Sequence, residues 1–349
     1  MSKSDLGASV RQRLLNQARE QGRPFQELLQ YYVMERFLYR LSKSKFRNAF
    51  VLKGALLLTA WRAPQSRPTM DIDLLGQTSN DLEYLRLAVQ EICCSRVEPD
   101  GVEFRVETLE IQKIKEDAEY EGARVRLLAL VANARVTLQI DIGFGDVIVP
   151  HAAEIEYPVL LEFAAPKLLA YSRETVVAEK LEAITVLGLL NSRMKDYFDL
   201  RLLSRLYEFD GTLLLRAVDA TFKRRSTEIE ALPVGLTSEF SSAPGKSAQW
   251  KAFLRRSRFE AEHADVNEVI VAVRHFAGPL LFAAAGENKF AFLWKLAGLG
   301  RKSDAHGIEN HRRVASSNLA RRAKFSFFFN YLQTACFSSF FRRRAVVKS

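Results

Sequence analysis

The chain has 349 residues, 48% of them hydrophobic, and a formal net charge of +10. This length and apolar content suffice to bury a sizeable core and predict two domains or one large one. We expect no bilayer-spanning stretch and no N-terminal signal core, and three cysteines make neither a disulfide framework nor a zinc site. The composition therefore predicts a cytoplasmic protein without a membrane partner.

The excess positive charge lies entirely in residues 286–349, which hold 13 Lys and Arg against 3 Asp and Glu. The body of the chain is neutral overall, so the high pI does not by itself indicate nucleic-acid binding. Nine of the 24 phenylalanines also lie in this tail, without a steady helical period. We expect that the basic, Phe-rich tail is not part of the evolved fold. A nucleic-acid arm and a membrane-surface segment are the other interpretations.

The first 45 residues predict two helices that pack on the core. Apolar residues recur at three- and four-residue steps over residues 9–21 and 24–42. Pro24 suits a first helical position, where its missing N–H costs no hydrogen bond.

The strongest functional signal lies in residues 51–75. A short apolar run ends at Lys53 and Gly54, a helix-like segment and a Pro-rich loop follow, and Asp71 and Asp73 then open a second apolar segment. Side chains in a strand repeat every second residue, so the two carboxylates share one face. Like charges at that spacing repel each other, and a bound cation is the usual way to relieve the repulsion.

After a helix over residues 81–94, strand-like runs follow at 102–111, 124–131 and 135–142, the last two spaced as in a hairpin. Asp141 offers a third carboxylate inside the apolar run of the last strand. Three carboxylates that converge on Mg²⁺ beside a glycine turn are equipment for phosphoryl or nucleotidyl transfer. The order of elements predicts an α/β or α+β fold with a mixed sheet.

From Ser172 onward the pattern is almost continuously helical. We expect helices over residues 173–190, 195–206, 212–224, 250–258 and 266–282, with a Ser/Gly/Pro-rich linker at 236–247. Lys195, Asp196 and Asp199 fall on one side of their helix, where Lys195 and Asp199 are i,i+4 neighbours. Such a face suits a nucleotide, because Lys can bind a polyphosphate and a paired Asp can orient the Lys or bind a ribose or base. An ordinary salt-bridged helix surface is the alternative.

Taken in order, GA, RPTMDIDL, LQIDIGFGD, AEKLEA and RMKDYFDL resemble the AbiEii/AbiGii-type toxin nucleotidyltransferases. These belong to the DNA polymerase beta-like superfamily and act in bacterial toxin–antitoxin and phage-defence systems. The resemblance covers residues 30–285. It implies a nucleotidyltransferase domain over residues 46–165 and a helical domain over residues 166–285 that completes the nucleotide site.

The resemblance also assigns roles to particular residues. Gly54 would open the phosphate-binding helix, although Ala55 stands where the family usually has Ser or Gly. Ala55 still offers its backbone N–H to a phosphate but no hydroxyl. The remaining implied roles are metal binding and catalysis by Asp71, Asp73 and Asp141, and nucleotide binding by Lys180, Lys195, Asp196 and Asp199.

The implied reaction is Mg²⁺-dependent transfer of a nucleoside monophosphate from an NTP to an acceptor, by analogy the 3′ end of a tRNA. A cognate antitoxin is the implied protein partner. Two other classes of function remain open from the residues alone. One is a metal-dependent nuclease or phosphodiesterase that uses the same carboxylates, and the other is a binding protein that retains the fold without catalysis.

Overall fold

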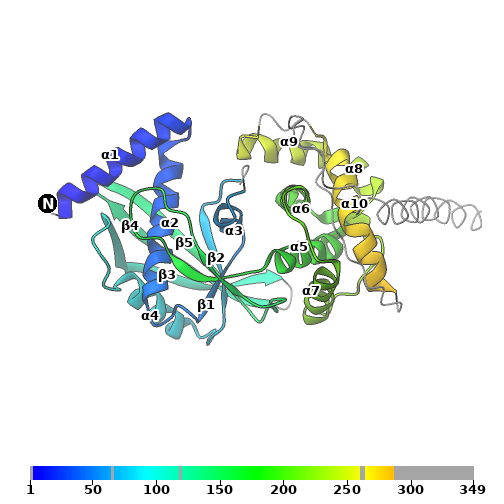
Figure 1. Ribbon diagram of the computed structural model, residues 1–349, viewed down its shortest axis with the longest axis horizontal. Coiled ribbons are helices and arrows are strands. Elements are labelled where there is room, and N and C mark those ends of the chain that lie inside the picture. The colour runs from blue at the N-terminus through cyan, green and yellow to red at the C-terminus, as the bar shows by residue number, and fades with distance from the viewer. Residues whose placement is uncertain (1–2, 64–66, 118–119, 260–263, 287–349) are drawn as a thin grey trace, which may run out of the picture. The chain divides into compact units, whose positions relative to one another are not determined.

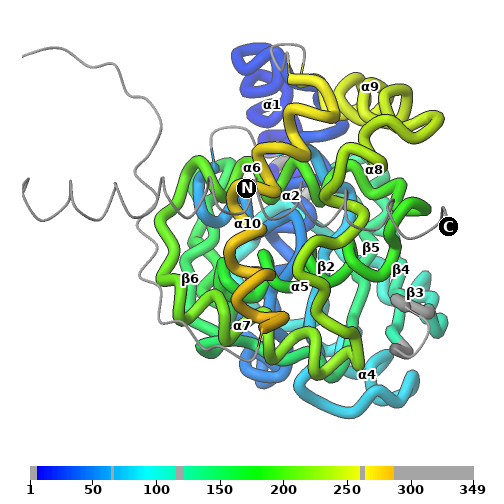
Figure 2. Tube along the Cα trace, turned by 90° about the vertical axis from the view of Figure 1, so that its right-hand side faces the viewer, coloured from blue at the N-terminus to red at the C-terminus, as the bar shows by residue number. Residues whose placement is uncertain are grey.

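The computed structural model describes residues 3–63, 67–117, 120–259 and 264–286. Beyond Gly286, the basic tail lies outside these described residues. Within them the protein combines helices with one seven-stranded sheet (Figures 1 and 2). The predicted mixed α/β fold class is therefore confirmed.

The sheet contains β1 Phe50–Lys53, β2 Asp71–Gly76, β3 Val102–Asp117, β4 Tyr120–Val131, β5 Ala134–Phe144, β6 Ala153–Glu156 and β7 Lys167–Ala170. The helices of the first half are α1 Lys3–Gln21, α2 Phe25–Lys43, α3 Leu56–Ala60 and α4 Leu82–Cys93. Those of the second half are α5 Arg173–Leu187, α6 Met194–Leu206, α7 Gly211–Arg224, α8 Ser238–Ser242, α9 Lys246–Ser257 and α10 Val266–Ala285. Most agree with the predicted elements to within a few residues, and α8 lies in the predicted linker.

The strand order is β3-β4-β5-β2-β1-β7-β6. Two neighbouring pairs, β2 with β5 and β1 with β7, run parallel, and the other pairs run antiparallel. The predicted hairpin joins β4 to β5, with Ala132 in the left-handed region at φ 51°. The sequence pattern did not indicate β6 and β7. Each has four residues, which is too short for a readable alternation.

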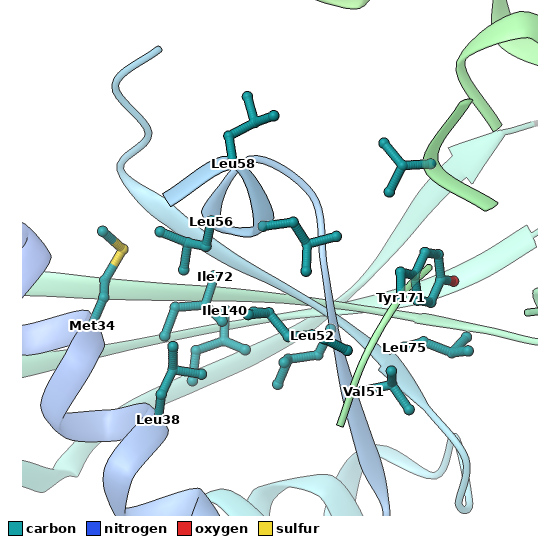
Figure 3. Packing of buried hydrophobic residues seen from close by; sticks show 14 of the residues in the cluster. Met34, Leu38, Val51, Leu52, Leu56, Leu58, Ile72, Leu75, Ile140 and Tyr171 are labelled. Atoms are coloured by element: carbon teal, nitrogen blue, oxygen red, sulfur yellow. The ribbon is translucent and has the colours of Figure 1, made fainter. Parts of the chain in front are cut away.

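One face of the central strands is apolar and packs against α2. Met34 and Leu38 on α2 are buried with Ile72 of β2 and Ile140 of β5 in the cluster that Figure 3 shows. Successive side chains of a strand point to opposite faces. The acidic residues that flank these isoleucines along β2 and β5 therefore point away from α2.

The helices of the second half pack mainly on one another, with α5 against α6 and α7 and with α10 against α6, α7 and α8. The predicted cap of α5 is present, since the Ser172 side chain accepts a hydrogen bond from the backbone N–H of Thr175. Helix α5 is thus anchored directly after β7, the strand that pairs with β1. This connection places the start of the helical part next to the centre of the sheet.

Helix α10 corrects the expectation that no stretch is apolar enough to cross a membrane. Its 20 residues satisfy that criterion by length and composition, with a mean hydropathy of 1.5. Only a few charged residues, such as Glu268 and Arg274, interrupt its apolar sequence. Val269, Val273 and Ala277 nevertheless lie fully buried against the neighbouring helices, so this face of α10 is part of the helical core.

A buried ion pair gives a test of how α2 is fastened to the sheet. The Arg40 guanidinium on α2 donates to both oxygens of Asp100, just before β3, at 2.7 and 3.0 Å. Arg40→Met leaves that carboxylate buried and unpaired, which costs about 3–5 kcal/mol. We expect a matching fall in the free energy of unfolding, measured by urea denaturation.

The matched control is Arg47→Met. Arg47 pairs with Glu154, and both side chains are more than half exposed. Removal of an exposed pair costs about 1 kcal/mol or less. Equal losses in the two variants would contradict the assigned role of Arg40.

Candidate active site

Three carboxylates meet where β2 and β5 run side by side. The parallel register sets Asp73 directly opposite Asp141, and Asp71 opposite Gln139. One oxygen from each of Asp71, Asp73 and Asp141 lies within 4.8 Å of the other two. The structure therefore brings together the three acids that the sequence singled out, although about 70 positions separate the first two from the third.

The electrostatics of this triad favour a bound cation. Burial raises the pKa of Asp73 to about 6, and the charge on Asp71 adds to the shift, while Lys53 and Lys195 oppose it. The Thr69 hydroxyl donates a hydrogen bond to Asp71. All three metal-ligand candidates are carboxylates, which hard divalent cations such as Mg²⁺ prefer. The triad therefore fits a divalent metal ion.

Gly54 makes room for the triad. It directly follows β1, whose Lys53 lies opposite Asp73 in the antiparallel register, and its φ is +73°. A Cβ at this position would overlap Oδ2 of Asp73, a contact that no folded protein tolerates. The sequence suggested that Gly54 lets the backbone approach a phosphate, and the structure adds that any side chain here would displace Asp73.

Ala55 follows Gly54 as the N-cap residue of α3 and is almost fully buried. Helix α3 has only five residues. The Ala55 side chain forms no capping hydrogen bond. Any contribution of Ala55 to phosphate binding is therefore limited to its backbone.

Asp141 already has a cationic partner. The Arg124 guanidinium on β4 donates from Nε at 2.8 Å and from Nη2 at 2.7 Å to the two carboxylate oxygens. Gln139 adds a hydrogen bond at 3.3 Å. The antiparallel register places Arg124 opposite Asp141, so the pair forms directly across two neighbouring strands. Sequence reasoning missed Arg124 because only the register of β4 on β5 identifies it.

The helical part contributes a buried group of opposite charges. The Lys180 ammonium on α5 lies 2.7 Å from Asp196 and 2.8 Å from Asp199, both on α6. Burial works to lower the pKa of Lys180, but the two carboxylates outweigh it and raise the pKa. The sequence suggested that Asp196 and Asp199 orient Lys195 or bind the nucleoside. In the structure both acids hold Lys180, and Lys195 is exposed.

Arg67 joins this group to the triad. It lies four residues before Asp71, and its Nε is 3.2 Å from both carboxylate oxygens of Asp199. Burial works to lower the pKa of Arg67, but Asp199 and Asp196 outweigh it and raise the pKa. The charge on Asp73 adds to the rise, so the guanidinium lies close to both clusters. The two motifs that the sequence presented separately are thus neighbours in space. Arg67 is visible in the RPTMDIDL motif but received no role there.

A second buried ion network lies beside the triad. Lys53 donates to Asp146 at 3.0 Å, and Arg225, at the end of α7, contacts the other oxygen of Asp146 at 3.0 Å. Arg225 also lies 3.4 Å from Glu179 on α5. Burial would raise the pKa of Asp146, but Lys53 and Arg225 hold it at about 2. Burial raises the pKa of Glu179 to about 7, and Asp146 adds to that shift.

Sequence reasoning missed this network as well, although each member lies in or near a motif. Asp146 ends LQIDIGFGD, Lys53 precedes the glycine turn, and Glu179 precedes Lys180. Isolated charges of this kind are normally exposed. Their burial could not be predicted from the sequence, because it depends on how α5 and α7 pack near the ends of β1 and β5.

A mixed sheet with a carboxylate triad beside a glycine turn, joined to a helical part through buried ion pairs, has the parts of a nucleotidyltransferase. Comparison with protein families supports this class. The model of the family described as nucleotidyl transferase AbiEii toxin, type IV TA system, matches residues 36–272. The chain therefore belongs to the AbiEii nucleotidyltransferase toxin family. Membership implies a nucleotide substrate and an antitoxin partner.

Two solved structures from Helicobacter pylori are similar to this chain. A candidate nucleotidyltransferase is 15% identical, and the match covers 74% of this chain and 95% of that chain with a TM-score of 0.41. The protein JHP933 is 16% identical, with coverage of 74% and 92% and a TM-score of 0.43. No curated protein matches the chain. The assignment to the family therefore rests on the family model.

The tight packing at Gly54 predicts the effect of the smallest possible side chain. Gly54→Ala places a methyl group against Asp73 at a positive φ, so Asp73 must leave the triad. We expect at least about a tenfold loss of Mn²⁺ affinity by isothermal titration calorimetry. Gly245→Ala, at another positive φ but with no atom nearby, is the matched control. Equal affinities of wild type and Gly54→Ala would rule out this role.

The raised pKa of Glu179 predicts how stability depends on pH. Because this pKa moves from 4.5 to about 7 on folding, the folded chain binds the proton more tightly between these values. The stabilisation is complete below pH 4.5 and is lost as the pH rises through 7. We expect Tm to fall from pH 5 to pH 8, and to fall less in Glu179→Gln, whose side chain does not titrate.

Burial also raises the pKa of Glu35 to about 7, so Glu179→Gln reduces the fall in Tm without removing it. Differential scanning calorimetry at both pH values measures the effect. The same fall in wild type and Glu179→Gln would show that Glu179 does not titrate as its burial indicates.

Proposed function

We propose that this toxin-family nucleotidyltransferase uses Mg²⁺ to transfer a nucleoside monophosphate from an NTP to an RNA acceptor, the 3′ end of a tRNA. One observation carries the proposal: Asp71, Asp73 and Asp141 converge on adjacent parallel strands beside a glycine turn. Within the AbiEii family, this arrangement favours transfer over binding of a nucleotide alone. Three carboxylates that repel one another are suited to a divalent cation, and such a cation can activate a phosphate for transfer.

In this proposal Asp71 and Asp73 hold the divalent ion, with Asp141 as the third carboxylate. A bound Mg²⁺ would polarise the α-phosphate and lower the pKa of the attacking hydroxyl. Thr69 fixes the Asp71 carboxylate through its hydroxyl. We assign Asp141 as the general base that helps to remove the proton from the acceptor hydroxyl.

We assign nucleotide binding to two lysines of the helical part, Lys195 and Lys180. Lys195 is exposed, and its charge lowers the pKa of Asp73, so its ammonium lies near the triad and suits the triphosphate. Lys180 has three N–H donors, two of which bind Asp196 and Asp199. The third donor is free to bind a phosphate or hydroxyl of the nucleotide. Gly54 and Ala55 add backbone N–H groups at the turn.

The biological setting follows from the proposed substrates. An enzyme that modifies tRNA with NTPs acts where both occur, in the cytoplasm, and its product would arrest translation. A cognate antitoxin would prevent this arrest. We propose that the system protects a bacterial population during phage infection, as abortive-infection toxins do.

The decisive test uses Asp73→Asn, which keeps the shape of the side chain and removes its charge. The purified protein is incubated with a tRNA pool, Mg²⁺ and each α-labelled NTP in turn. We expect labelled tRNA with the wild type, and at least a hundredfold less, about 3 kcal/mol of activation energy, with Asp73→Asn. Glu103→Gln, an exposed acid on β3, is the control.

The same assay separates the other classes of function. RNA that shortens in Mg²⁺ without any NTP would indicate a nuclease. Growth inhibition that is equal for wild type and Asp73→Asn in cells without antitoxin would indicate a protein that acts by binding. Either result would overturn the proposal.

A further inference from the structure

Arg124 stands out because its guanidinium binds a carboxylate, Asp141, that a metal ion at the triad would also use. Its guanidinium binds both oxygens of Asp141 at 2.7 and 2.8 Å, in the bidentate geometry that makes such pairs strong. The Asp141 side chain is only 9% exposed, so water competes weakly for it. Asp141 is therefore neutralised from within the protein.

The neighbouring carboxylates differ from Asp141 in their partners. Asp71 accepts a hydrogen bond from the neutral Thr69 hydroxyl, and Asp73 packs against the backbone of Gly54. The triad thus divides into a pair that still requires a cation and a third member that already has one. A first divalent ion is drawn to the pair.

Formal charge then limits how many divalent ions the triad can hold. Among the groups in direct contact, the three carboxylates carry three negative charges, of which Arg124 cancels one and a divalent ion the other two. Lys53 and Lys195 nearby add further positive charge, so a second ion would have to displace the guanidinium or enter a site of net positive charge. Negative charge from a triphosphate removes this obstacle, which links the second ion to the nucleotide.

We propose that Arg124 is a positioning residue that limits the triad to one divalent ion until nucleotide is present. It acts by holding Asp141 across the β4–β5 pair. This inference rests on the proposed function in that both assume a divalent ion at the triad. Its test counts ions without nucleotide or acceptor, so it stands even if the acceptor proves not to be tRNA.

The experiment measures Mn²⁺ bound per full-length chain, by electron paramagnetic resonance of the free ion. The double variant Asp71→Asn, Asp73→Asn defines ions bound elsewhere on the chain. Above that baseline we expect one Mn²⁺ for the wild type and two for Arg124→Gln. Addition of Asp141→Asn to Arg124→Gln should return the number to one. Two ions in the wild type, or one in Arg124→Gln, would overturn the proposal.

The chain offers a matched control in Arg126, two residues along the same strand and on the same face. Arg126 donates to the neutral Gln139 at 3.0 Å rather than to a carboxylate. Arg126→Gln should bind one ion, as the wild type does. A second ion in this variant as well would show that the effect is general surface charge, and would overturn the specific role of Arg124.

Arg124→Lys decides the question if Arg124→Gln does not fold. An ammonium keeps the charge but cannot form the bidentate pair, so it releases Asp141 more easily. The second ion should then bind to this variant at Mn²⁺ concentrations at which the wild type still holds one. An isotherm identical to that of the wild type would contradict the proposal.

Discussion

The repulsion among Asp71, Asp73 and Asp141 is the constraint on which the rest of this site depends. The three acids lie side by side on two parallel strands, at the start of β2 and inside β5, with oxygens within 4.8 Å of one another and Asp141 almost fully buried. Such a group is unstable unless cations surround it. Arg124 of β4, Lys53 of β1 and Arg67 of the loop before β2 supply positive charge nearby. Gly54 leaves the space in which Asp73 fits.

The same demand for counter-charge couples the sheet to the helical part. Arg67, beside the triad, pairs with Asp199 of α6, and Lys53 of β1 joins Asp146 to Arg225 at the end of α7. These ion pairs are buried, so loss of one partner leaves the other charge unpaired at high cost. The helices are therefore coupled to the site, because buried ion pairs join their charged side chains to the loop before β2 and to the end of β1.

Much of the fold and part of the site were predictable because they depend on local patterns. Alternation alone placed Asp71 and Asp73 on one face, and the apolar run around Asp141 indicated a strand with an unusual acid. Ser172 signalled the start of α5. In contrast, the four-residue strands β6 and β7 carry no readable period. The expectation that no stretch is apolar enough to cross a membrane was wrong at α10, which meets that criterion although one of its faces packs on the helical core.

The sequence by itself determined which residues are the candidates for the chemistry, since periodicity, caps and the order of motifs depend only on near neighbours in the chain. Only the tertiary structure decided their partners. Asp196 and Asp199 hold Lys180 rather than the nearby Lys195, and Arg124 binds Asp141, because strand register and helix packing bring these groups together. Contacts between residues far apart in the chain leave no local pattern, so no reading of neighbours can reveal them.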